Sequence, residues 1–248
     1  MRRALTTLAK QVPLELHGVT LGLASAVAVD KRRLENTARL IDQVHPEFWS
    51  EHLAFVRGGG IEIGHLAAPP RTNATIEGAA DNLRAARSIV GAMPLVENIA
   101  TLIDPPGSTT SEAEWTAKIV SESSCAMLLD LHNLYANSVN FGFDPYACID
   151  RLPQESIRAV HLAGGRWITA KSSSENRLLD DHLHDVPDEV FELLSYVGRR
   201  TSHELTVILE RDGRFPPMRT LMSQLERARR TLARSRQERR GDAATKAA

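Results

Sequence analysis

The sequence predicts an α/β fold in which parallel strands and helices alternate as a TIM (β/α) barrel. Three observations predict it: six short apolar runs, helical patterns between them, and a length of 248 residues, at which such barrels commonly form one domain. Each run has the length of a buried strand, and strands that alternate with helices are typical of a parallel sheet. The predicted strands lie near residues 14–19, 48–55, 94–99, 125–133, 157–164 and 205–210.

The segments between the runs carry helix signals. Asp30 can cap a helix whose apolar residues follow the 3.6-residue period, and residues 75–91 form a second such segment. Ser111 and Glu114 match a capping box, and Pro187 suits the first turn of a later helix. We therefore expect the order strand, helix, strand to repeat along the chain.

Acidic and imidazole side chains recur at the ends of these runs. The carboxyl ends of parallel strands meet at one rim of a barrel, so we expect these side chains to converge. Imidazole and carboxylate groups suit iron, zinc or manganese, and the set contains no cysteine of the kind that thiolate zinc sites or iron–sulfur clusters use. The set is too large for one ion, so two or three ions are expected. The candidate ligands are His17, His52, Glu97, Asp130, His132, His161, Asp180, His182 and Glu210.

Each candidate also has a structural explanation when taken alone. A single buried histidine is more often a hydrogen-bonded core residue than a ligand, and a strand-end glutamate such as Glu97 or Glu210 is often salt-bridged. The recurrence at six strand ends favours the metal centre, because packing alone rewards apolar residues there. Of the acidic and histidine-rich segment 180–185, only Asp180 and His182 are expected to be ligands. His45 and His203 lie outside the strand ends and are expected to be structural or exposed. His65 lies in the glycine-rich loop and is either a lid residue or exposed to solvent.

Composition excludes several classes of protein. A formal net charge of -1 argues against a nucleic-acid partner, since domains that grip phosphate backbones carry a basic excess. Cys125 and Cys148 are too few for a disulfide framework and lack CxxC spacing, which fits a reducing cytoplasm. No apolar run approaches the roughly 20 residues of a membrane span, and the first residues lack the apolar core of a signal peptide. A cytoplasmic protein without a membrane partner is expected.

Two long connections interrupt the alternation, at residues 56–73 and 167–187. Loops longer than about 12–15 residues in a compact domain are usually functional or disordered, and both follow strand ends. We expect them to cover the metal centre as lids. Residues 1–235 are predicted to form a single metal-binding domain, and residues 236–248 a disordered basic tail.

Seven segments together resemble one family, in order and spacing, over about residues 12–232. They are LHGVTLGLASA, SEHLAF, ENIAT, LLDLHNLYANSVNFGFDP, VHLAGG, DDHLHDVPDEVF and ILERDGRFPP. They resemble the multinuclear non-haem iron-dependent oxidases, which include the enzymes that modify cysteines of methanobactin-type precursor peptides. The resemblance implies a xylose-isomerase-like barrel with two or three iron ions of mixed valence. It also implies O2 as co-substrate, a ribosomally made precursor peptide as substrate, and a separate peptide-recognition protein as partner.

The resemblance also assigns roles to the candidate ligands. It implies that Glu97, Asp130, His161 and Glu210 hold the reactive irons. By the same resemblance, His132, Asp180 and His182 hold a third ion. His17 and His52 complete the set of ligands.

The chain departs from the family pattern in three places. The family usually reads DVNN where this chain has Asp130-Leu131-His132-Asn133, so an imidazole replaces an amide. The family often has histidine where Gly165 stands, which implies the loss of a pocket donor or a proton-transfer group. The family's first two strands have no counterpart here. We expect either that the chain is part of a longer gene product or that its barrel is incomplete.

Two other functions fit the same residues. A redox-neutral metal enzyme on this barrel, a sugar isomerase or a phosphodiesterase of the endonuclease IV kind, would use the same ligands with zinc or manganese. A relative that binds a partner without catalysis would fit the missing strands.

Overall fold

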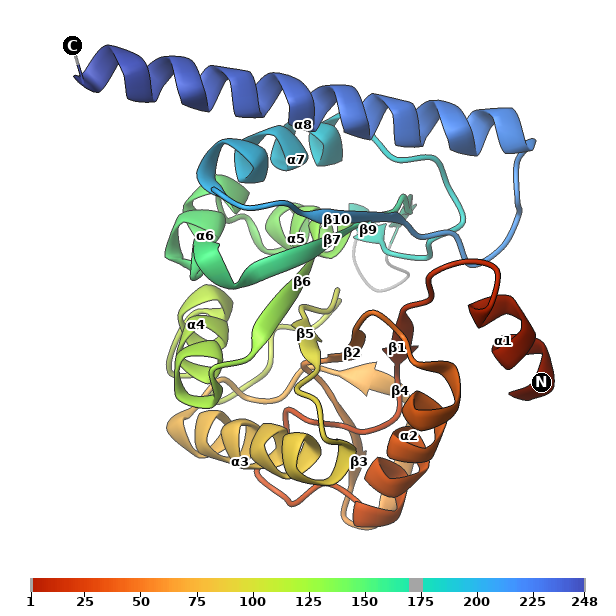
Figure 1. Ribbon diagram of the computed structural model, residues 1–248. Coiled ribbons are helices and arrows are strands. Elements are labelled where there is room, and N and C mark those ends of the chain that lie inside the picture. Colours follow the sequence, from red (N-terminus) through yellow and green to blue (C-terminus); the bar gives the residue numbers. More distant parts are fainter. Residues whose placement is uncertain (1, 170–175, 248) are drawn as a thin grey trace. The chain divides into compact units, whose positions relative to one another are not determined.

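The computed structural model describes residues 2–169 and 176–247, and strands and helices alternate along it (Figure 1). The strands are β1 (Leu16–Gly18), β2 (Trp49–His52), β3 (Phe55–Gly58), β4 (Ile61–Ala67), β5 (Leu95–Glu97), β6 (Ala126–Asp130), β7 (Ile157–Leu162), β8 (Arg166–Thr169), β9 (Asn176–Leu179) and β10 (Thr206–Leu209). The helices are α1 (Arg2–Ala9), α2 (Lys31–Val44), α3 (Asn73–Val90), α4 (Glu112–Ser123), α5 (Leu131–Phe141), α6 (Pro145–Arg151), the 3-10 helix η1 (Gln154–Ser156), α7 (Asp188–Arg200) and α8 (Met218–Ala247).

Six of these strands form one sheet in the order β1-β2-β5-β6-β7-β10, which is also their order in the chain. The pairs β1–β2, β2–β5, β5–β6 and β7–β10 are parallel. Each of the six overlaps one of the predicted apolar runs, and a complete barrel of this class has eight. The predicted α/β architecture with six recognisable strands is therefore confirmed for the described residues.

The described residues form two compact units. The first comprises Met1–Ile99 and Pro105–Leu128, and the second Ala100–Asp104 and Leu129–Ala248. Helix α8 continues to Ala247, past the predicted domain end at residue 235. This helix includes residues predicted as a basic tail, and Arg234 forms an ion pair with Glu238 one turn further on.

In the first unit the helices begin where the sequence predicts. The Asp30 carboxylate accepts hydrogen bonds from the first backbone N–H groups of α2, and both halves of the capping box of Ser111 and Glu114 are present at α4. Helix α3 packs against α2 and α4 (Figure 1), and Leu34 and Leu83 are fully buried between these helices and the strands. Burial of such side chains supplies most of the stability of short amphipathic helices.

The two connections predicted as lids contain antiparallel hairpins. Strand β3 pairs with β4, and β8 pairs with β9. Gly59 and Gly60 form the turn between β3 and β4 with φ of 56° and 80°, values that L side chains rarely adopt. The sequence signal for a hairpin was therefore present in the glycine run. Residues 170–175 of the second connection lie outside the described part of the chain.

In the second unit α7 packs against α5, α6 and α8 (Figure 1). Pro187 is the residue just before α7, one position earlier than predicted, and its fixed φ still prepares the first turn. Val190 and Leu194 of α7 are fully buried, and Ala228 and Leu232 of α8 are buried as well. Among the described residues, no helix is both long and apolar enough to cross a membrane.

A buried amide holds the segment that follows β1. The side-chain Nδ2 of Asn82, on α3, donates to the carbonyls of Leu23, Ser25 and Val27 at 3.0–3.1 Å, and its Oδ1 accepts from the Val29 N–H at 2.8 Å. Asn82 is almost fully buried, so these backbone groups have little water to replace it.

We expect Asn82→Ala to lower the free energy of unfolding by about 2–4 kcal/mol, because removing the amide leaves buried backbone groups unsatisfied. Urea denaturation followed by circular dichroism measures the change. Asn36→Ala, at an exposed position of α2, is the matched control and is expected to stay within about 0.5 kcal/mol of the parent chain. Equal stability of the two variants would contradict the role of Asn82.

Candidate metal centre

Three predicted ligands of the first unit meet at adjacent strands. His17 lies on β1, His52 ends β2 and Glu97 ends β5, and His52 is paired in register with Glu97. The Nε2 atoms of His17 and His52 lie 3.1 and 3.2 Å from Glu97 Oε2 and 3.3 Å from each other. Two imidazoles and a carboxylate thus direct one donor atom each toward a common point, which is a ligand set for a first-row transition metal.

The outer ring nitrogens of both histidines are held by neighbouring groups. His52 Nδ1 donates to the Gly18 carbonyl at 3.0 Å, and His17 Nδ1 is hydrogen-bonded with Ser50 Oγ at 2.7 Å. A hydrogen bond at Nδ1 orients the ring and leaves Nε2 available for a metal. The two rings are therefore fixed in the orientation that metal binding requires.

Glu51 is a functional residue that the sequence reasoning missed. Its carboxylate is buried, with Oε1 accepting from the His52 N–H at 3.0 Å and Oε2 from the Leu21 N–H at 3.1 Å. A Cβ at Gly18 would lie 2.6 Å from Glu51 Oε2, so this glycine makes room for the carboxylate. Burial lowers the pKa of His52, but Glu51 and Glu97 outweigh it and raise that pKa above the usual value. An acidic residue inside a fully buried strand was the available signal.

In the second unit, three more predicted ligands converge. His132 lies in the first turn of α5, and Asp180 follows β9. Asp180 Oδ1 lies 2.6 Å from His132 Nδ1 and 2.9 Å from His182 Nε2. His182 has a φ of 51°, a left-handed conformation that is uncommon for residues other than glycine and often occurs at functional sites.

The ends of β6, β7 and β10 add the remaining ligands of this unit. His161 Nδ1 lies 2.8 Å from Glu210 Oε2 and 3.9 Å from Asp130 Oδ2, and His182 Nδ1 lies 3.4 Å from the same Glu210 oxygen. The other oxygen of Asp130 accepts the Asn133 N–H at 2.6 Å and caps α5. Capping therefore fixes the orientation of the Asp130 carboxylate, whose second oxygen lies 3.9 Å from His182 Nε2.

The electrostatics of the second unit keep the carboxylates of Asp180 and Glu210 ionised. Burial lowers the pKa of His182, but Asp180 and Glu210 outweigh burial and raise it to about 12. Burial opposes ionisation of Asp180 and Glu210, yet the neighbouring histidines hold the pKa of each carboxyl below its usual range. The assembly is a set of negative oxygens around imidazoles, as a cation site requires.

Two buried atoms of this group test whether a metal fits. His182 Nε2 and Glu210 Oε2 are buried and have no hydrogen-bond partner among the described residues, although Asp180 and His161 lie within 2.9 Å of them. Donor atoms that approach closely without hydrogen-bond geometry point at a shared position rather than at one another. His182 Nε2 belongs to the group with His132 and Asp180, and Glu210 Oε2 lies beside His161, so a divalent cation in each of these two groups would give each atom a partner.

The residues of segment 180–185 have two different sets of partners. Asp181 turns away from Asp180 and holds His184 Nδ1 at 2.9 Å and Arg166 Nε at 3.2 Å. The three histidines expected outside the centre lie elsewhere. His45 is exposed at the end of α2. His65 is exposed and hydrogen-bonded to the Leu66 carbonyl, and His203 is hydrogen-bonded to the Ile157 carbonyl.

A carboxylate absent from the predicted set also reaches this group. Asp212 Oδ2 lies 3.7 Å from His182 Nδ1, and the Asp212 N–H donates to the His182 carbonyl at 3.0 Å. Its side chain is two-thirds exposed, so it borders the group from the solvent side. The sequence signal was its position two residues after Glu210, where the ERD triplet was read only as a possible salt-bridged strand end.

The two internal departures from the family pattern are physically linked. A Cβ at Gly165 would lie 2.6 Å from Cε1 of the His132 ring and would also collide with the Leu179 carbonyl. The imidazole of His132 thus occupies the space that the Cβ atom of any other residue at position 165 would need. A histidine at both positions is incompatible with this arrangement.

Metal binding is expected to release protons, and the apparent affinity is expected to rise with pH. His182 is protonated at neutral pH because of its raised pKa, whereas a metal binds the neutral imidazole. Asp180 and Glu210, with lowered pKa values, are already ionised and contribute no proton. Calorimetric titration with manganese(II) between about pH 6.5 and 7.5 should show roughly tenfold tighter binding for each displaced proton. An affinity that does not change with pH would contradict a protonated His182.

A family model described as "RiPP precursor modification enzyme MbnB/TglH/ChrH" matches residues 1–233. The chain belongs to this family. Curated relatives carry only the name UPF0276 protein. The relative from Streptomyces avermitilis is 36% identical over 234 residues, which cover 92% of this chain and 47% of that protein. The relative from Chromobacterium violaceum is 35% identical over 220 residues, which cover 89% of this chain and 77% of that protein. The chain thus spans about half the length of the first relative.

Solved structures similar to this family member share the barrel fold. A xylose isomerase domain protein from Planctomyces limnophilus has a TM-score of 0.56 at 11% identity and covers 94% of this chain and 84% of that one. The 3-keto-D-glucoside 4-epimerase YcjR of E. coli also has a TM-score of 0.56, at 12% identity over 92% of this chain and 86% of that one. These likenesses confirm the predicted xylose-isomerase-like TIM-barrel fold.

Proposed function

We propose that this protein is an iron-dependent oxidase that uses O2 to modify a cysteine of a ribosomally made precursor peptide. One observation carries the proposal: in each unit, imidazoles and carboxylates from separate strand ends direct their donor atoms at a shared point, in a chain that matches a precursor-modifying family over residues 1–233. Sites on this fold lie at the carboxyl ends of the strands, where these side chains are found.

The residues divide the work of holding the ions. In the first unit His17, His52 and Glu97 would bind one ion, with Glu51 and the Gly18 carbonyl orienting His52. In the second unit, imidazoles and carboxylates from β6, α5, β7, the segment after β9 and the end of β10 would bind the others. Those ligands are Asp130, His132, His161, Asp180, His182 and Glu210.

Bound iron would supply one-electron chemistry with O2 and open positions for a thiolate. The donor set suits that role, because oxygen and imidazole ligands leave iron able to change oxidation state and to exchange ligands. The protein's own contribution is geometry and charge. Burial of Glu97, Asp130 and His161 keeps water from competing for these side chains. A separate peptide-recognition protein is proposed to present the substrate.

The test loads the protein with iron(II) without air and then adds O2 together with a cysteine-bearing candidate precursor peptide. We expect O2 uptake and a change in the peptide's mass, both dependent on iron. Iron-loaded protein that neither consumes O2 nor alters the peptide would overturn the proposal.

Metal content distinguishes the alternatives. A redox-neutral isomerase would purify with zinc or manganese, remain colourless and convert sugars without O2. A relative that only binds a partner would retain no stoichiometric metal. Iron with visible absorption after exposure to air supports the oxidase.

A further inference from the structure

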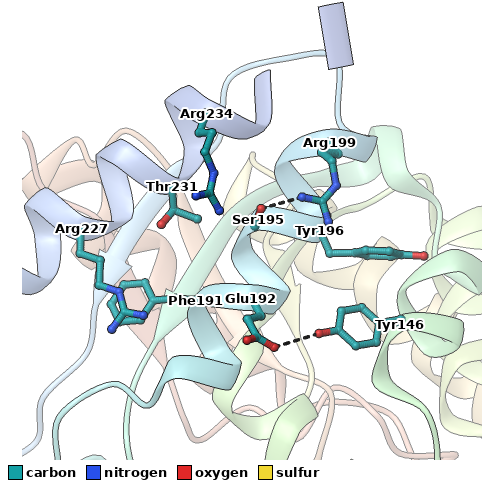
Figure 2. A pocket seen from close by; sticks show the side chains of 9 residues that line it. All are labelled: Tyr146, Phe191, Glu192, Ser195, Tyr196, Arg199, Arg227, Thr231 and Arg234. Atoms are coloured by element: carbon teal, nitrogen blue, oxygen red, sulfur yellow. Dashed lines mark hydrogen bonds between the residues drawn. The ribbon is translucent and has the colours of Figure 1, made fainter. Parts of the chain in front are cut away.

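A second candidate site lies among the helices of the second unit, where a groove of 630 Å³ opens between α6, α7 and α8. Figure 2 shows guanidinium groups and aromatic rings along this groove. Arg199 comes from α7, and Arg227 and Arg234 come from α8, with Tyr146 and Phe191 beside them. None of these residues is a candidate metal ligand.

The groove arginines already bind carboxylates. Arg227 contacts Asp188 at 2.7 Å, and Glu238 is shared by Arg199 at 3.3 Å and Arg234 at 3.5 Å. Glu238 is almost half exposed, so its carboxylate is exchangeable rather than sealed in the core. Arginine pairs of this kind recognise carboxylates through directed hydrogen bonds. One carboxylate of the chain itself thus occupies the position that a ligand's carboxylate would take.

The guanidinium groups are held in place by rings and hydroxyls. Arg227 lies 3.9 Å above the ring of Phe191, and Arg199 lies 5.8 Å from that of Tyr196. Arg199 also donates to Ser195 Oγ at 2.8 Å, and Ser195 is itself buried and bonded to Ser235. Fixed guanidinium groups lose little freedom on binding, which favours a ligand.

Charge defines the ligand class. Helix α8 has eight arginines and two glutamates over residues 218–240, a net charge of +6 from 8 − 2. Glu192 lines the groove together with the three arginines, and Asp188 and Glu238 form ion pairs with those arginines. Arginines with carboxylates set among them suit a peptide with separated carboxylates better than the continuous charge of a nucleic-acid backbone. The rings offer apolar surface for the residues between those carboxylates.

We propose that this groove binds an acidic peptide segment of a partner protein. Carboxylates of the segment replace Glu238 on Arg199 and Arg234, and an apolar side chain lies against the ring of Tyr146 or Tyr196, which pack edge-on at 4.8 Å. The site is independent of the metal centre and of the oxidase chemistry.

The test is fluorescence anisotropy with the full chain and a short labelled peptide in which glutamate alternates with leucine. The double variant Arg199→Gln and Arg234→Gln is expected to weaken binding by about tenfold or more. Glu238→Gln is expected to strengthen it by roughly threefold or more, since it removes the internal competitor. Weaker binding by the arginine double variant together with tighter binding by Glu238→Gln would identify this groove as the binding site. Binding should weaken as salt rises from about 50 to 300 mM.

Arg84→Gln, an exposed arginine of α3 that pairs with Asp81, is the matched control and should leave the affinity unchanged. Circular dichroism and metal content verify that each variant folds. Equal binding of a peptide with glutamine in place of glutamate, the same affinity in all variants, or tighter binding of duplex DNA through the same arginines would overturn the proposal. The peptide-binding assay needs neither iron nor O2. Its result therefore does not depend on the result of the oxidase test.

Discussion

Asp180→Asn is expected to remove metal from the second unit and to lower any metal-dependent activity by at least about 100-fold. The Asp180 oxygen lies 2.6 Å from His132 Nδ1 and 2.9 Å from His182 Nε2, so the substitution removes a carboxylate that contacts both imidazoles. An amide oxygen carries no formal charge and attracts a divalent cation far less than a carboxylate. A loss of 100-fold in affinity corresponds to roughly 3 kcal/mol.

Asp181→Asn is the matched control because it changes the neighbouring residue in the same way. Asp181 bonds His184 and Arg166 instead of the candidate ligands, so metal content should not change. Elemental analysis gives the number of ions per chain. Thermal unfolding with and without manganese(II) adds an independent measurement, since a ligand that binds only the folded state raises the melting temperature. The same metal content in both variants would refute the assignment of Asp180.

The strand ends could be predicted because one physical rule governs them. Packing rewards apolar residues within a buried strand, so a histidine or acid that follows each run stands out, as Glu97, Asp130 and Glu210 do. Asp180 and His182 do not follow from this rule and are selected by their position in segment 180–185 and by the family resemblance, while Asp181 contacts His184 and Arg166. Helix starts were predictable for a similar reason, because a cap such as Asp30 satisfies specific backbone donors.

Other features depend on contacts that the sequence pattern does not encode. Glu51 lies within a strand instead of at its end, and its partners Leu21 and His52 are known only once β1 and β2 pair. The sequence pattern predicts loops at the hairpins β3–β4 and β8–β9, because β4 and β8 are mostly exposed and carry no buried apolar run. The exclusion of a side chain at Gly165 by His132 is likewise visible only in three dimensions.

The ligand groups share one principle of construction. Several ligands have one end held by a backbone or neighbouring group and the other end directed at the other ligands of the group. His52 is fixed by the Gly18 carbonyl, and Asp130 by the N–H of Asn133. Such outer contacts orient ligands before an ion arrives, which reduces the cost of binding.

The second large effect is expected for His52→Ala, which should remove the ion proposed for the first unit. The substitution leaves His17 and Glu97, whose Nε2 and Oε2 atoms are 3.1 Å apart, as two ligands where three were available. Two protein ligands hold a first-row metal much more weakly than three, so we expect at least one ion fewer per chain. The Glu51 carboxylate keeps its bond to the Leu21 N–H, so the strand should remain in place.

His45→Ala controls for the loss of an imidazole, because His45 is exposed at the end of α2 and has no part in the ligand group. We expect His45→Ala to retain its metal. Asp180, His182 and Glu210 belong to the ligand groups of the second unit, so the His52→Ala protein should keep the ions proposed there, and its metal content should fall without reaching zero. Metal content identical in the two variants would show that His52 holds no ion, and its short contacts with Glu97 would then be a structural ion pair of the kind that buried strand ends use.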